Sequence, residues 1–185
     1  MQANHIANRI GAAFLGSFFF LLIGCAEPEL PLGQSASSNA TSVQSNEKKT
    51  DSGSALDIFK SPTCGCCDKW VEHIEQRGFT PTTYHPADLS ELKAEQGVAP
   101  QYQSCHTAVS AEGYVFEGHI PARYIRDFLA NPPADTRGLA VPAMPVGSPG
   151  MEVEDRFMPY EVLLLKADGG VEVFARVQTP AQQYQ

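Results

Sequence analysis

The residues best suited to chemistry are three cysteines packed into four positions, Cys64, Cys66 and Cys67. Cys64 and Cys67 have the C-x-x-C spacing, and Gly65 lets the backbone turn tightly so that several sulfur atoms can converge. The flanking pattern places them where a strand passes into a helix, and the free N–H groups and helix dipole there favour a thiolate over a thiol. Because a thiolate is both a nucleophile and a soft metal ligand, the motif indicates metal binding or thiol chemistry.

The elements on either side must position this motif. Residues 56–59 alternate apolar and polar, as in a strand, whereas Trp70, Val71 and Ile74 share one face of a helix that ends near Gly78. The predicted elements are a strand at 56–59, a helix at 67–76, a strand at 79–84, a helix at 88–96, a hairpin of 106–110 and 114–117, a helix at 121–130, and a hairpin of 161–166 and 171–177. This order predicts an α/β fold, a thioredoxin-like β-α-β-α-β-β-α arrangement with an additional C-terminal β-hairpin.

A fourth cysteine, Cys105, is expected at the start of the third strand, which lies against the CxxC motif in a thioredoxin-like arrangement. Four thiols in one place leave three interpretations. Two disulfides are one alternative, and a tetrahedral zinc site is another. However, three ligands within four residues are tighter than the usual zinc knuckle, and bridging thiolates in a polynuclear Cu(I) site suit such crowding better.

Histidines surround the predicted cluster. His119 ends the fourth strand, on the side of the CxxC motif, and is a candidate ligand or gate. His106 adjoins Cys105, but strand alternation predicts that it points to the opposite face, so it is the weaker candidate. His73 lies on the first helix and is expected at the surface.

Two methionines, Met144 and Met151, lie in or next to a segment rich in proline and glycine, residues 142–150. Thioethers bind Cu(I), so both are weaker candidate ligands, although methionines also simply fill gaps in packing. The stiffness of the segment suggests either a lid over the site or an extended crossover.

The N-terminal segment has the features of an export signal. An apolar run, residues 10–23, is too short to span a bilayer comfortably and ends at Gly24-Cys25, which resembles a bacterial lipobox. We expect a lipoprotein signal peptide at 1–24, lipidation of Cys25, a lipid-anchored flexible linker at 25–54, and the folded domain at 55–185. Ala26 favours the outer membrane by analogy with lipoprotein sorting, so the expected location is the periplasm, with the chain lipid-anchored to the outer membrane. An ordinary signal peptide with a chance cysteine is the alternative.

The overall charge argues against one class of partner. The formal net charge is −8 at pH 7, and no cluster of lysine and arginine stands out. Nucleic-acid binding depends on such clusters, so no nucleic-acid partner is expected.

Several motifs together resemble the CopG-like copper-resistance family, long catalogued only as a domain of unknown function. They are SPTCGCCDKW at 61–70, SCHT at 104–107, EGHIP at 117–121, and the segments 138–142 and 144–152, and the match extends over residues 56–177. The resemblance implies a thioredoxin-like fold, a periplasmic setting, Cu(I) bound by the CGCC and CH cysteines, and a role in copper tolerance. A periplasmic redox or copper-efflux protein is the expected partner.

The sequence therefore predicts a Cu(I)-binding protein that holds several copper ions with Cys64, Cys66, Cys67 and Cys105, and with His119 as a secondary ligand. The alternative is a thiol-disulfide or copper oxidoreductase in which Cys64 is the nucleophile and Cys67 the resolving thiol. A third hypothesis is a structural adaptor whose cysteines are oxidised and inert.

Overall fold

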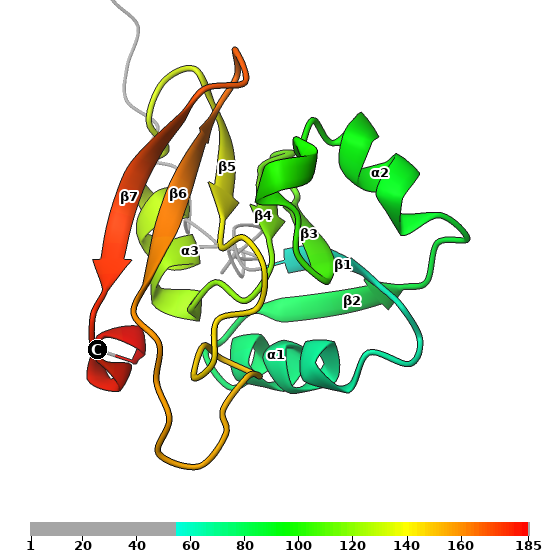
Figure 1. The fold of residues 1–185 in the computed structure, drawn as a ribbon. Coiled ribbons are helices and arrows are strands. Elements are labelled where there is room, and N and C mark those ends of the chain that lie inside the picture. Colours follow the sequence, from blue (N-terminus) through cyan, green and yellow to red (C-terminus); the bar gives the residue numbers. More distant parts are fainter. Residues whose placement is uncertain (1–54, 185) are drawn as a thin grey trace, which may run out of the picture. The chain divides into compact units, whose positions relative to one another are not determined.

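The structure is a computed structural model that describes residues 55–184. The predicted signal peptide, Cys25 and the linker lie outside the described residues. Seven strands form one mixed sheet in the order β2-β1-β3-β4-β5-β6-β7 (Figure 1). The strands are β1 (Ala55–Lys60), β2 (Thr80–Tyr84), β3 (His106–Ser110), β4 (Val115–Glu117), β5 (Thr136–Ala140), β6 (Tyr160–Lys166) and β7 (Val171–Val177). The helices are α1 (Gly65–Glu75), α2 (Leu89–Glu95) and α3 (Ala122–Ala130), with short 3-10 helices η2 (Pro100–Tyr102) and η3 (Pro180–Gln183).

Two crossover helices give the sheet its parallel pairs. β1 and β2 are parallel and joined through α1, while β4 and β5 are parallel and joined through α3. The remaining neighbours, β1 with β3, β3 with β4, β5 with β6, and β6 with β7, are antiparallel. As a result, the end of β1 and the start of β3 are paired neighbours, with Lys60 opposite His106. The chain therefore enters α1 directly beside the point where β3 begins.

One face of the sheet carries the main core. Ile58 of β1 and Phe116 of β4 are buried there with Trp70 of α1 and Phe128 of α3. Each of these side chains is 0% exposed, and full burial of a large apolar side chain contributes roughly 1.5–3 kcal/mol. Packing of α1 and α3 on this face fixes the position of the start of α1.

The opposite face is covered in part by α2. Its Lys93 reaches Thr107 and Glu117, which alternate along their strands with core residues such as Ala108 and Phe116. The N-terminus of α2 is capped by Asp88, whose carboxylate accepts hydrogen bonds from the backbone N–H groups of Ser90 and Glu91. This confirms the predicted start of the helix.

The structure bears out the predicted mixture of helices and strands, with two differences. The predicted hairpins are present as β3–β4 and β6–β7, but β5 was not predicted. β5 pairs with both β4 and β6, so the C-terminal hairpin continues the same sheet. In addition, α1 begins at Gly65 and not at Cys67, so the CGCC motif already belongs to the helix start.

None of the helices in the described part of the chain is both long enough and apolar enough to cross a membrane.

Candidate metal centre

The CGCC motif forms the first turn of α1. Cys64 is the N-cap residue, and Cys66 and Cys67 follow within that turn. The first N–H groups of a helix have no intrahelical acceptor, and together with the helix dipole they favour negative charge on nearby sulfur. Cys64 and Cys67 form a disulfide, and the Sγ atom of Cys66 lies 3.5 Å from that of Cys64.

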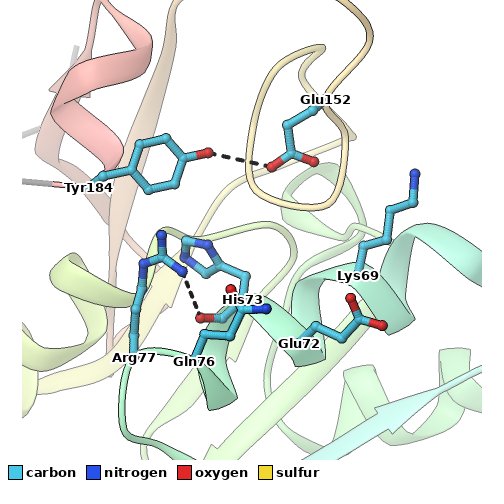
Figure 2. Close-up of a pocket in the computed structure, with 7 residues that line it drawn as sticks. All are labelled: Lys69, Glu72, His73, Gln76, Arg77, Glu152 and Tyr184. Carbon is cyan, nitrogen blue, oxygen red and sulfur yellow. Dashed lines mark hydrogen bonds between the residues drawn. The ribbon is translucent and has the colours of Figure 1, made fainter.

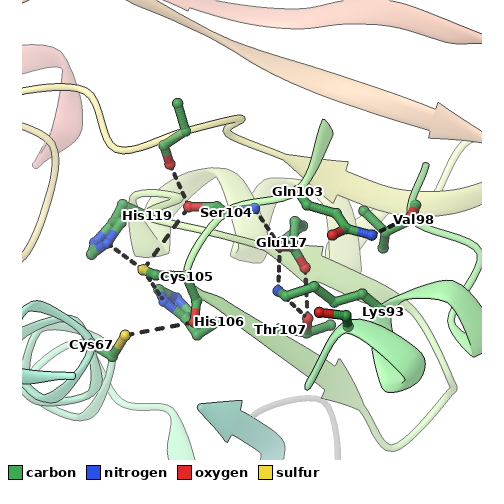
Figure 3. A network of polar contacts seen from close by, with 12 residues as sticks. Cys67, Lys93, Val98, Gln103, Ser104, Cys105, His106, Thr107, Glu117 and His119 are labelled. Carbon is green, nitrogen blue, oxygen red and sulfur yellow. Dashed lines mark hydrogen bonds and ion pairs between the residues drawn. The ribbon is translucent and has the colours of Figure 1, made fainter. Parts of the chain in front are cut away.

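Cys105 completes a group of four sulfur atoms. It immediately precedes β3, and its backbone oxygen lies 3.9 Å from the Sγ atom of Cys67 (Figure 3). The sulfur atoms of Cys64, Cys66, Cys67 and Cys105 all lie within 4.8 Å of one another. Within residues 55–184, Cys66 and Cys105 are the free thiols. The structure thus brings together the four cysteines that the sequence singled out.

His119 adds a nitrogen donor to this group. Its Nδ1 atom lies 2.8 Å from the backbone oxygen of Pro149, and its Nε2 atom lies 2.9 Å from the Sγ atom of Cys105 (Figure 3). A carbonyl oxygen only accepts, so Nδ1 carries the proton and Nε2 of the neutral ring has a lone pair directed at the sulfur. A second hydrogen bond that fixes the tautomer in this way is typical of metal-binding histidines.

His106 also contacts Cys105, contrary to the prediction that it points away. Its Nδ1 atom lies 3.3 Å from the Sγ atom of Cys105, and the ligand atoms of Cys105, His106 and His119 lie within 4.8 Å of one another. The prediction was wrong because Cys105 precedes the strand, so strand alternation does not relate the two side chains. His106 is 0% exposed, lies against Trp70, and its buried Nε2 atom has no hydrogen-bond partner.

Burial governs the protonation of these groups. Burial first, and the neighbouring Cys66 second, raise the pKa of the Cys105 thiol to about 12. Burial lowers the pKa of His106 well below its usual value and also lowers the pKa of His119. Near neutral pH both imidazoles are therefore uncharged and Cys105 is a thiol. A metal ion that binds here must displace the thiol proton.

A loop closes over the start of α1. Residues 147–150 are buried, and a Cβ atom added to Gly150 would lie 2.6 Å from the backbone oxygen of Cys66 and 2.9 Å from the backbone nitrogen of Trp70. The same loop supplies the Pro149 oxygen that binds His119. Of the two methionines proposed as weaker ligands, Met144 is 48% exposed and Met151 is half-buried.

A polar network behind Cys105 was not predicted from the sequence. Glu117 is 0% exposed and accepts hydrogen bonds from Lys93, Thr107 and the backbone N–H group of Ser104 (Figure 3). The sequence shows only an isolated lysine in one helix and an isolated glutamate in one strand. Their proximity depends on the packing of α2 against the sheet.

A hollow lies along α1, and no cysteine lines it (Figure 2). It has a volume of about 400 Å³ and is lined by Lys69, Glu72, His73, Gln76, Arg77, Glu152 and Tyr184. His73 was expected at the surface, but it is only 7% exposed. Its Nε2 atom accepts a hydrogen bond from the backbone N–H of Ala122. The prediction failed because α3 begins against this face of α1.

Comparison with known proteins assigns the family. The family described as a protein of unknown function, DUF411, matches residues 102–151. Two solved structures, described as copper resistance protein CopG in form 1 and form 2, are each 43% identical to this chain with a TM-score of 0.63. The matches cover 66% of this chain, and 96% and 97% of those chains. This chain belongs to the CopG family. Among curated proteins no match is found.

The donor set of this CopG family member suits a soft metal ion. Thiolates select ions such as Cu(I) and zinc, and neutral imidazole nitrogens complement them. With the Cys64–Cys67 disulfide closed, Cys66 and Cys105 are the thiols of the group. A site that uses all four sulfurs therefore requires reduction of that disulfide, because its sulfur atoms carry no thiolate charge.

Proposed function

We propose that this protein binds Cu(I) in copper resistance, with several ions held by a thiolate cluster of Cys64, Cys66, Cys67 and Cys105, and with His119 as a further ligand. The observation that carries the proposal is the approach of all four sulfur atoms to within 4.8 Å of one another. Cu(I) is favoured over zinc because three of the thiols lie within four residues, a spacing that suits bridging thiolates.

His106, Met144 and Met151 are weaker candidate ligands in this proposal. His106 is supported by its 3.3 Å approach to the Cys105 sulfur and by its buried, unpartnered Nε2 atom. The methionines are supported only by their position in or beside the loop that closes over the start of α1.

The proposal includes a thioredoxin-like fold for the first half of the domain. It is supported by the strand order β2-β1-β3-β4, in which β1 and β2 are parallel and β3 is antiparallel to both of its neighbours. The position of the CxxC motif at the start of α1, between β1 and β2, agrees with it.

The proposed location is the periplasm, with the chain anchored to the outer membrane through acylated Cys25. This is supported by the apolar run that ends at Cys25 and by Ala26 after it. A periplasmic redox or copper-efflux protein is the proposed partner. Intact mass measurement of the mature chain tests the anchor: an acylated Cys25 at the N-terminus is expected, and an unmodified N-terminus contradicts it.

Copper per protein, measured by elemental analysis, tests the cluster. The full chain is reduced, loaded with Cu(I) without oxygen, and compared with a Cys105→Ser variant treated in the same way. The parent should retain several copper ions, and the variant fewer, because one of the four thiolates is missing. Tighter binding of zinc than of Cu(I) in direct competition, or no retained copper, contradicts the proposal.

The alternative is a thiol-disulfide or copper oxidoreductase, which the Cys64–Cys67 disulfide favours. In the thiol-disulfide version, the Cys64 thiolate attacks a substrate disulfide and releases one thiol. Cys67 then attacks the Cys64 sulfur, closes its own disulfide and releases the second thiol. A Cys64→Ser variant should lose this activity on a peptide disulfide, and equal rates in variant and parent contradict the alternative.

A further inference from the structure

Glu117 is a buried carboxylate that accepts three hydrogen bonds from donors in different parts of the chain. Lys93 of α2 donates to its Oε1 atom at 2.5 Å, and Thr107 of β3 donates to its Oε2 atom at 2.6 Å. The backbone N–H group of Ser104 also donates to Oε1, at 2.6 Å. The Lys93 and Glu117 side chains are 5% and 0% exposed.

A buried ion pair of this kind is weak evidence of stabilisation. The attraction between the charges is offset by the loss of their hydration, and apolar residues of similar volume often serve as well. What the pair does provide is a fixed acceptor for one specific backbone group. That group belongs to Ser104, the residue immediately before Cys105.

Gln103 and Ser104 are also held by Ala143, which follows β5. The Ser104 hydroxyl donates to the backbone oxygen of Ala143, and the Ala143 N–H group donates to the backbone oxygen of Gln103 at 3.3 Å. Ser104 can approach this closely only because residue 118 is glycine: a Cβ atom there would lie 2.6 Å from the Cβ atom of Ser104. The Gln103–Ser104 peptide thus donates its N–H group to Glu117 and accepts at its C=O group from Ala143, directly before Cys105.

We propose that Glu117, held in place by Lys93 and Thr107, is a positioning residue for Cys105. By fixing the Ser104 N–H group it places the Cys105 sulfur 2.9 Å from Nε2 of His119 and within 4.8 Å of the other three sulfur atoms. The consequence for copper rests on the proposed function, whereas the effect on the Cys105 thiol does not.

The test compares two double variants of the full chain that differ only in the side chain at position 117. The first, the glutamine variant, combines Glu117→Gln with Lys93→Met; it removes both charges but keeps an amide oxygen that can accept from Ser104. The second, the methionine pair, combines Glu117→Met with Lys93→Met; it fills the same space and offers no acceptor. Circular dichroism and thermal unfolding establish that each variant is folded.

Copper affinity is measured by competition with a chromophoric Cu(I) chelator. The methionine pair should bind Cu(I) about 10- to 100-fold more weakly, as is typical when a group that orients a metal ligand is lost. The glutamine variant should stay close to the parent. In a Cys105→Ser background the methionine pair should have no further effect, because the residue being positioned is absent.

Two results would overturn the proposal. One is an equal loss of Cu(I) affinity with and without Cys105, which a general structural role predicts. The other is an unchanged affinity in the methionine pair. If the methionine pair does not fold, Thr107→Val removes one donor to the same carboxylate and is tested in the same two backgrounds. An affinity loss that depends on Cys105 supports the proposal, and an unchanged affinity overturns it.

A metal-free measurement separates this proposal from the proposed function. With the Cys64–Cys67 disulfide closed, alkylation of Cys66 and of Cys105 is followed by mass spectrometry of their peptides. The methionine pair should speed alkylation of Cys105 several-fold and leave Cys66 unchanged, even if the parent binds no copper. Unchanged Cys105 reactivity, or equal acceleration at both cysteines, contradicts the positioning role.

Discussion

At the scale of single residues, His119 presents an unprotonated ring nitrogen to the Cys105 sulfur. The Pro149 oxygen holds the proton on Nδ1, and burial lowers the pKa of the ring so that Nε2 keeps its lone pair near neutral pH. The Cys105 thiol donates its proton to this lone pair at 2.9 Å. Loss of that one proton turns the contact into a pair of metal donors, a thiolate and an imidazole.

His119→Phe should therefore weaken Cu(I) binding while preserving the size of the ring. We expect a loss of at least about tenfold, or about 1.4 kcal/mol, in competition with a chromophoric Cu(I) chelator. His85→Gln is the matched control, because His85 is exposed, its Nδ1 atom contacts the backbone oxygen of Lys60, and it does not belong to either group of donor atoms around the cysteines. Equal affinities of His119→Phe and the parent would exclude His119 as a ligand.

The sequence could single out the candidate donor residues, but not the contacts that they make with one another. Cysteine spacing and the strand-to-helix pattern placed Cys64 and Cys67 correctly at the start of a helix. The contact of His106 with Cys105 could not be predicted, since it depends on the backbone just before β3 and not on strand periodicity. Likewise, the acceptor for the Nδ1 proton of His119 comes from a loop 30 residues later in the chain.

At the scale of elements, the loop after β5 is the part that confines the cluster. Gly150 has a φ of +84°, and its Cα approaches the backbone of α1 at Cys66 and Trp70 so closely that no side chain fits. Without this approach, the Pro149 oxygen would not meet His119. The glycine thus serves both the backbone conformation and the close packing of the loop.

Gly150→Ala should destabilise the protein more than Gly113→Ala does. Gly113 has a similar φ of +87° but no atom within 4 Å of an added Cβ, so it isolates the conformational cost of roughly 1–2 kcal/mol. The steric conflict at Gly150 should add about 1–3 kcal/mol, measured by urea unfolding of both variants in the same redox state. Equal destabilisation of the two variants would show that the loop does not pack tightly on α1.

The prediction of elements failed where pairing, not local pattern, makes the strand. β5 has the sequence TRGLA, with Gly138 at its centre, and no alternation marks it. It exists because β4 and β6 supply hydrogen-bond partners on both sides, and because Gly138 lets the chain approach Val115, where a Cβ atom would collide. By contrast, β3, β6 and β7 have local strand patterns and were predicted within one residue of their ends.

At the scale of the whole molecule, buried histidines couple folding to pH. Burial, together with the charge of Arg77, lowers the pKa of His73 to about 3, and its Nε2 atom must stay unprotonated to accept from Ala122. The hollow beside it contains the charged groups Lys69, Glu72, Arg77 and Glu152 (Figure 2). Between pH 6.5 and 3 the unfolded chain therefore protonates His73 and the folded chain does not, so stability falls as the pH falls.

His73→Gln should lower the number of protons taken up on unfolding by about one, and so weaken the pH dependence of stability. Near pH 5, removal of one such histidine should lower the slope of unfolding free energy against pH by about 1.4 kcal/mol per pH unit. Part of the slope should remain, because His106 and His119 also have lowered pKa values. The slope is obtained from urea unfolding between pH 7 and 5, with Tyr184→Phe in the same hollow as the control. The phenol binds no proton in this range, so the control should keep the parent's slope, whereas an unchanged slope in His73→Gln would contradict the assignment of a neutral, buried His73.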